Sequence, residues 1–123
     1  DVDAEFERVY TAVLESNEAG IDAIVAGVKA ADVDEACRIV LREYGYEEHF
    51  LHSTGHGVGL EVHEEPRLSQ LNENAVPAGA VVTIEPGVYL PGWGGIRIED
   101  DVFLSEEGPV LLSDGDTDLR EIT

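Results

Sequence analysis

The chain has 123 residues, which is the size of a single domain and enough to bury a hydrophobic core. Its 27 acidic and 7 basic residues give a net charge of −20, which excludes nucleic acid as a partner because such a surface repels phosphate. The sequence contains neither a long apolar run nor a basic cluster, so we expect no membrane span and no binding to anionic membranes.

The low numbers of cysteine and lysine residues indicate the kind of cellular compartment in which the protein works. Cys37 is the only cysteine, which excludes an internal disulfide and suits a reducing cytoplasm. Lys29 is the only lysine among the seven basic residues. We interpret such a composition as that of a halophile, whose salt-rich cytoplasm screens self-repulsion; an ordinary acidic protein is the alternative. Because the chain lacks methionine and begins at Asp1, we expect it to be a fragment of a longer protein.

Apolar residues at three- and four-residue spacing predict two helices in the first third of the chain. The first apolar stripe covers about residues 3–24 and contains one polar member, Asn17. The second covers about residues 32–44 and is followed at once by Gly45, a typical helix stop. Cys37 lies on the second stripe, so we interpret it as a packing residue.

After Gly45 the pattern changes to strands separated by turns. Alternation of apolar and polar residues predicts strands at 60–63, 81–85 and 96–104, and a short closing strand at 110–112. Glycine and proline residues mark the turns, and Pro86–Gly87 is expected to stop the second strand. Two helices followed by neighbouring strands predict an α+β fold, with the helices packed on a mostly antiparallel sheet.

A glycine-rich segment contains all four histidines of the chain, which are His49, His52, His56 and His63. Three glycines around His56 let the backbone approach another group closely. Histidine is the commonest metal ligand and also carries protons near neutral pH. A loop with merely solvated histidines is the alternative interpretation.

Two glutamates on the predicted strands can share one face of the sheet. Side chains alternate along a strand, so Glu85 and Glu99 face the same side if their strands pair antiparallel. Two neighbouring carboxylates repel each other unless a cation lies between them. With a histidine from the glycine-rich segment, they would form a donor set suited to Mn²⁺, Fe²⁺, Co²⁺ or Zn²⁺. The alternative is that both carboxylates face water.

Three sequence runs together resemble the C-terminal half of the catalytic domain of Xaa-Pro peptidases. The runs are HSTGHGVGLEVHEEP at 52–66, TIEPGVY at 83–89 and GIRIEDDV at 95–102. This family comprises the prolidases and aminopeptidases P among the pita-bread metallopeptidases. The resemblance covers residues 1–123 and implies one partial pita-bread domain. It further implies hydrolysis of the peptide bond before proline, with two divalent metal ions; Mn²⁺ is expected first, with Co²⁺ or Zn²⁺ as alternatives.

The resemblance also implies roles for individual residues. His56 and Glu85 match ligands of one metal ion, and Glu99 matches the ligand that bridges both ions. His52 matches a histidine that helps to bind the substrate, and His63 matches one that contacts the scissile-bond oxygen or the proline side. Glu85 would double as a proton shuttle. Two bridged ions would lower the pKa of a shared water and polarise the scissile carbonyl.

The chain departs from the family pattern in its number of ligands. The family uses five protein ligands, and two of them are aspartates from a preceding hairpin. Asp1 and Asp3 lack that context and are not assigned. With three ligands, the chain by itself is expected to be inactive, to have a weak or empty metal site, and to form homodimers through the surface that the missing half would cover. A non-catalytic pita-bread binding or assembly domain and a methionine aminopeptidase-like enzyme are the alternatives.

Overall fold

A computed structural model describes residues 2–58, 66–112 and 118–122. The helices are α1 (Val2–Ala23), α2 (Ala30–Glu43) and the short 3₁₀ helix η1 (Glu47–His49). The strands are β1 (Gly55–His56), β2 (Arg67–Leu68), β3 (Val81–Ile84), β4 (Gly87–Leu90), β5 (Gly94–Ser105), β6 (Gly108–Leu111) and β7 (Asp118–Ile122). All the strand pairings are antiparallel, which confirms the predicted α+β fold. The strand predicted at 60–63 lies outside the described residues.

Both predicted helices are confirmed, with α2 beginning two residues earlier than expected. The chain leaves α2 through Gly45, whose φ of 86° is in the left-handed region that glycine adopts without strain. Asn17, the polar member of the first stripe, is buried like the apolar residues around it. Within the described ranges, no helix combines the length and the apolar character needed to cross a membrane.

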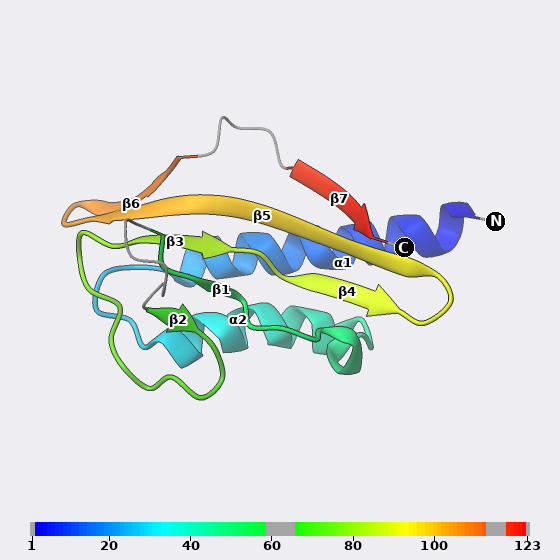
Figure 1. The fold of residues 1–123 in the computed structure, drawn as a ribbon, viewed down its shortest axis with the longest axis horizontal. Coiled ribbons are helices and arrows are strands. Elements are labelled where there is room, and N and C mark those ends of the chain that lie inside the picture. Colours follow the sequence, from blue (N-terminus) through cyan, green and yellow to red (C-terminus); the bar gives the residue numbers. More distant parts are fainter. Residues whose placement is uncertain (1, 59–65, 113–117, 123) are drawn as a thin grey trace.

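Strand β5 is the centre of the main sheet. Strands β3 and β4 pair along one edge of β5, and strands β6 and β7 pair along the other. Ile84 lies opposite Asp100 and Gly87 lies opposite Arg97. The two pairings share one register, so β3 and β4 follow each other along β5, as Figure 1 shows.

Strand β3 ends at Ile84, just before Pro86, as predicted, but the chain pairs with β5 again from Gly87 as β4, a strand that the sequence patterns did not predict. Proline removes one hydrogen-bond donor from the ladder without turning the chain away. Pro86 still accepts a hydrogen bond at its carbonyl from Ile98 N, at 3.3 Å. The continuous register therefore places Glu85 opposite Glu99 and Pro86 opposite Ile98.

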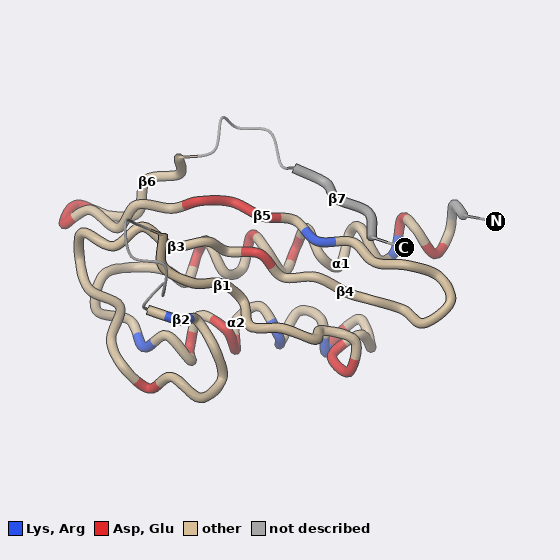
Figure 2. Tube along the Cα trace, in the orientation of Figure 1, with Lys and Arg blue, Asp and Glu red and all other residues tan. Residues whose placement is uncertain are grey.

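Both long helices cover the same face of the sheet, and α1 runs along β5 (Figure 1). The sheet residues in the two hydrophobic clusters beneath the helices are Val82, Ile84, Val88, Ile96, Ile98, Val102 and Leu104. Thr83, Glu85, Arg97 and Glu99 alternate with these residues and therefore lie on the opposite face. Figure 2 shows acidic residues spread over both helices and the sheet rather than gathered at one end.

Candidate active site

The segment that carries His56 lies along the outer edge of β3. Glu85 N donates to Thr54 O at 2.6 Å, and Val58 N donates to Val81 O at 2.7 Å. Gly55 lies so close to β3 that a Cβ atom there would be 1.8 Å from Thr83 O. A glycine at this position is therefore required by space, and it lets His56 approach Glu85.

Thr83 connects His56 to Glu85. Its hydroxyl oxygen accepts a hydrogen bond from His56 N at 3.0 Å and donates to Glu85 Oε2 at 2.6 Å. His56 Nε2 lies 3.3 Å from the same carboxylate oxygen. His56 Nδ1 lies 2.8 Å from Gly57 O, a carbonyl that only accepts, so Nδ1 donates this hydrogen bond. The other ring nitrogen, Nε2, faces the Glu85 carboxylate.

Arg97 lies against both glutamates. Its Nη1 atom is 3.4 Å from Glu85 Oε1, and its Nη2 atom is 3.7 Å from Glu99 Oε1. The register places Glu85 and Glu99 on one face of the sheet, as predicted. The guanidinium offsets the repulsion that two carboxylates on one face would otherwise feel.

His52 is held by Tyr89, a residue to which the sequence patterns assigned no role. His52 Nδ1 lies 2.8 Å from Ser53 O and so carries the proton of the neutral ring. His52 Nε2, 2.7 Å from Tyr89 Oη, then accepts the hydrogen bond of the tyrosine. Burial raises the pKa of Tyr89 and the Glu85 carboxylate raises it further, against the opposing effect of Arg97. Tyr89 is therefore a protonated donor near neutral pH.

A buried ion pair on α2 anchors the beginning of the same segment. Asp34 is fully buried and accepts hydrogen bonds from Arg38 Nε and from Thr54 N. Arg38 Nη2 donates to His52 O at 3.2 Å, and its guanidinium carbon lies 4.3 Å from the centre of the Phe50 ring. Local sequence patterns did not indicate this pair, because its function depends on a segment fourteen or more residues away.

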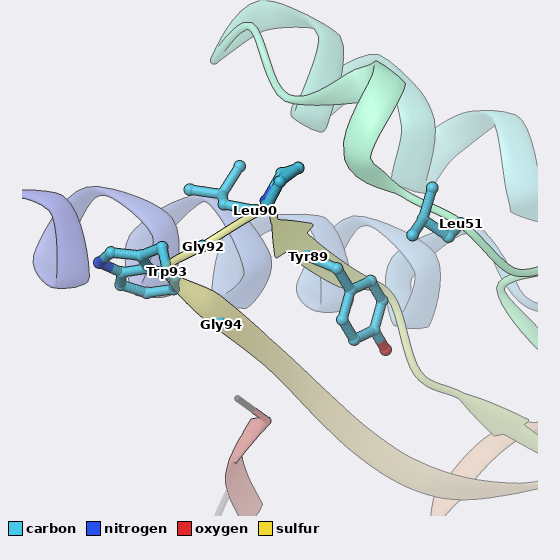
Figure 3. Close-up of a pocket in the computed structure, with 7 residues that line it drawn as sticks. Leu51, Tyr89, Leu90, Gly92, Trp93 and Gly94 are labelled. Atoms are coloured by element: carbon cyan, nitrogen blue, oxygen red, sulfur yellow. The ribbon is translucent and has the colours of Figure 1, made fainter.

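A mostly apolar pocket of about 530 Å³ lies beside Tyr89. It is lined by Leu51 and by the β4–β5 hairpin residues Tyr89, Leu90, Pro91, Gly92, Trp93 and Gly94 (Figure 3). Because Tyr89 also contacts His52, the pocket adjoins the polar residues described above.

The residues predicted as metal ligands fit a divalent ion by their chemistry. One imidazole nitrogen and two carboxylates suit Mn²⁺, Co²⁺ or Zn²⁺. His56 and Glu85 are adjacent, while Glu99 reaches them through Arg97. No group of three or more histidine, cysteine or acidic side chains is placed to hold a metal ion in the described part of the chain. His63, the remaining predicted site residue, lies outside that part.

The fold and the Gly-His-Gly and Glu-Pro-Gly segments define a class of proteins, the metallopeptidases with a pita-bread domain. Residues 1–106 match metallopeptidase family M24, and the chain belongs to this family. The predicted resemblance and the predicted fold, two helices on an antiparallel sheet of pita-bread type, are thereby confirmed.

Three proteins illustrate what the chain is similar to. An Xaa-Pro dipeptidase of Pyrococcus furiosus is 45% identical over 112 residues, which are 91% of this chain and 32% of that protein. The structure of an Xaa-Pro dipeptidase from Bacillus anthracis matches with a TM-score of 0.88 and 40% identity, over 94% of this chain and 32% of that one. An X-Pro aminopeptidase from Thermotoga maritima matches with a TM-score of 0.87 and 44% identity, over 94% of this chain and 33% of that one. The chain spans about a third of the length of the relatives it matches.

Proposed function

We propose that residues 1–123 are one part of a pita-bread domain that hydrolyses the peptide bond before proline. The observation that carries this proposal is the contact series from His56 through Glu85 and Arg97 to Glu99 on one face of the sheet. The relatives named Xaa-Pro dipeptidase and X-Pro aminopeptidase support the substrate class, a peptide with proline after the scissile bond.

In this proposal, His56, Glu85 and Glu99 hold two divalent ions, with Mn²⁺ preferred and Co²⁺ or Zn²⁺ as alternatives. Such ions supply Lewis acidity and water of lowered pKa. Gly57 O accepts the hydrogen bond from His56 Nδ1, so Nε2 is the nitrogen that would bind a metal ion. Thr83 holds the Glu85 carboxylate in place and leaves its other oxygen to face Arg97.

The remaining roles concern substrate and protons. His52 and His63 bind the substrate near the scissile bond, and the Tyr89 hydroxyl keeps the His52 ring in one orientation. Glu85 takes a proton from the attacking water and delivers it to the leaving nitrogen of proline, which needs a proton to depart.

We further propose that the preceding part of a longer protein supplies the remaining metal ligands. The three ligands in this chain are fewer than a two-ion site needs, and the proposed source of the others is an upstream hairpin with two aspartates. Among the side chains that the structure describes, none accepts a hydrogen bond from the buried Nε atom of Arg97. A carboxylate from that hairpin would satisfy this donor. We place the complete enzyme in a reducing cytoplasm, since its cysteine is buried and free.

The test compares the chain with the longer protein that includes its upstream segment. With Mn²⁺ or Co²⁺, the longer protein should cleave an Xaa-Pro dipeptide, and Glu85→Gln should abolish cleavage. Glu48→Gln, which changes an exposed acidic residue, is the control and should leave cleavage unchanged. Cleavage after an N-terminal methionine instead would favour the methionine aminopeptidase-like alternative. Metal binding and hydrolysis both missing from the longer protein would favour a binding or assembly domain.

A further inference from the structure

Asn17 contacts the sheet from the face opposite to the candidate active site. Its side chain is buried on α1, with 2% of the residue exposed. The Nδ2 atom donates to Ile84 O at 3.1 Å and to Ile98 O at 3.4 Å. These two carbonyls belong to the residues that immediately precede Glu85 and Glu99 in the sequence.

Pro86 explains why a polar side chain is needed at this place. Residues opposite each other in a hydrogen-bonded antiparallel pair exchange two hydrogen bonds. Ile98 N donates to Pro86 O, but Pro86 has no N–H with which to return a bond to Ile98 O. Ile98 is fully buried, so water does not supply the missing donor. The amide of Asn17 does so, and its second hydrogen reaches Ile84 O on the neighbouring strand.

We propose that Asn17 is a positioning residue that sets the separation of Glu85 and Glu99 for binding divalent metal ions, an inference that rests on the proposed function. One planar NH₂ group holds the backbones of β3 and β5 together at the point where the ladder lacks a bond. Glu85 directly follows Ile84, and Glu99 directly follows Ile98, so each glutamate is one peptide bond away from a carbonyl that Asn17 holds. A change in the distance between these two carbonyls therefore moves both carboxylates relative to each other.

Ser16 provides the matched control. It precedes Asn17 on α1, is fully buried, and donates from Oγ to Cys37 O at 2.9 Å. Ser16→Ala removes one buried hydrogen bond from a side chain to a backbone carbonyl, and Asn17→Ala removes two. Only the bonds of Asn17 reach the strands that carry the glutamates, because Cys37 lies on α2. A purely structural role for Asn17 predicts that both variants lose stability and that neither loses metal affinity.

The experiment measures Mn²⁺ binding by titration calorimetry and Co²⁺ binding by visible absorption, in the longer protein that includes the upstream segment. Asn17→Ala should weaken Mn²⁺ binding by about 10–100-fold and alter the Co²⁺ spectrum, as is usual when a group that orients metal ligands is removed. Ser16→Ala should change the dissociation constant by less than about twofold while lowering the melting temperature. Equal Mn²⁺ affinity in the two variants would overturn the positioning role.

A second variant keeps the test decisive if Asn17→Ala folds poorly. Pro86→Ala restores an N–H opposite Ile98 O, so Asn17→Ala should weaken Mn²⁺ binding less in the Pro86→Ala background than alone. An equal loss in both backgrounds contradicts the proposal. If the unchanged longer protein binds no Mn²⁺ and cleaves no Xaa-Pro peptide, the proposed function fails and the positioning role fails with it. If it binds and cleaves while Asn17→Ala behaves like Ser16→Ala, only the positioning role fails.

Discussion

Gly55 and Thr83 lie in close contact at the edge of β3. The His56 segment passes so close to β3 that the Gly55 backbone leaves no room for a side chain. This closeness places the main-chain N–H of His56 within hydrogen-bond distance of the Thr83 hydroxyl. The same hydroxyl holds Glu85, so the absence of a side chain at position 55 lets His56 and Glu85 lie near each other.

Gly55→Ala should therefore destabilise the protein by about 3 kcal/mol, because a Cβ atom 1.8 Å from Thr83 O forces the backbone of one segment to move. Urea unfolding followed by circular dichroism measures this change. Gly27→Ala is the control: Gly27 has a φ of 92° and nothing within 4 Å of its Cβ position, so only backbone strain is added. A loss for Gly55→Ala no larger than for Gly27→Ala would mean that the segment is free to shift.

Cys37 gives a prediction about pH. Burial, with a smaller contribution from nearby Asp34, raises the pKa of its thiol from 9.0 to about 11 against the lowering effects of Thr54, Ser16 and Arg38. The unfolded chain therefore loses this proton at lower pH than the folded one, so the stability contributed by the thiol is present below pH 9 and is lost as pH rises toward 11. The melting temperature of the protein should fall more steeply over this range than that of Cys37→Ala. If the melting temperatures of the protein and of Cys37→Ala fell in parallel with pH, the raised pKa of Cys37 would be contradicted.

At the scale of elements, α2 holds the histidine segment through a buried ion pair. Asp34 and Arg38 are one turn apart on α2, and both contact the backbone of residues 52–54. Helix α2 thereby supports the site without contributing a residue to it. The sheet supports the site differently, through a register that continues past Pro86 and aligns Glu85 with Glu99.

Asp34→Ala should cost about 3–5 kcal/mol of unfolding free energy, because it leaves the Arg38 guanidinium buried without its carboxylate. The double variant Asp34→Leu with Arg38→Met should recover much of this loss, since both charges are then absent. Glu35→Ala is the control on the same helix and should have little effect, because its pair with Arg42 is exposed. Urea unfolding of the four proteins tests these outcomes. A double variant that is no more stable than Asp34→Ala would contradict the view that the unpaired charge of Arg38 causes the loss of stability.

At the scale of the whole molecule, the main feature is the large negative net charge. The net charge is −20, and Figure 2 shows the acidic residues of the described part of the chain spread over both helices and the sheet. Repulsion therefore acts on the folded state as a whole. We propose that the chain comes from a halophile, in which molar salt screens this repulsion. The proposal rests on the charge and on the single lysine.

The melting temperature should rise as KCl increases from 0.1 M to 2 M. Most of the gain should occur at the lower concentrations, where the screening length changes most. The double variant Glu106→Gln with Glu107→Gln removes two exposed charges at the β5–β6 turn. It should melt higher at low salt and gain less from KCl. A melting temperature that KCl leaves unchanged or lowers would contradict the halophile proposal.

The outer strand of the sheet gives a prediction about assembly. Val110 and Leu111 in β6 and Leu112 just after it are 46%, 44% and 53% exposed, and β6 pairs only with β5 among the described strands. We propose that the chain by itself forms homodimers through this edge, where the rest of a pita-bread domain would pack.

Sedimentation velocity in molar KCl should show dimers that Leu111→Lys converts to monomers, because a charged side chain blocks pairing of strand edges. Leu71→Lys is the control, since Leu71 is 93% exposed but lies outside the strands, and should leave the dimer intact. A monomer at every protein concentration would contradict this proposal, as would equal effects of the two substitutions.

The sequence by itself determined the helices, the alternation along 81–85 and 96–104, and the family. These features depend on local spacing and on short runs of residues, which are present in the chain before it folds. The common face of Glu85 and Glu99 followed from alternation once antiparallel pairing was assumed, and the register bears out that assumption.

Only the tertiary structure decided how the site is held together. The strand after Pro86 was missed because a proline within a local pattern indicates an end, whereas its neighbour β5 continues the ladder beyond it. Asn17 was the one irregular member of an apolar stripe, and its partners Ile84 and Ile98 lie 67 and 81 residues away. Tyr89, Asp34 and Arg38 likewise act on residues distant in sequence. Such contacts form only when packing brings separate segments together, so no local pattern of residue types encodes them.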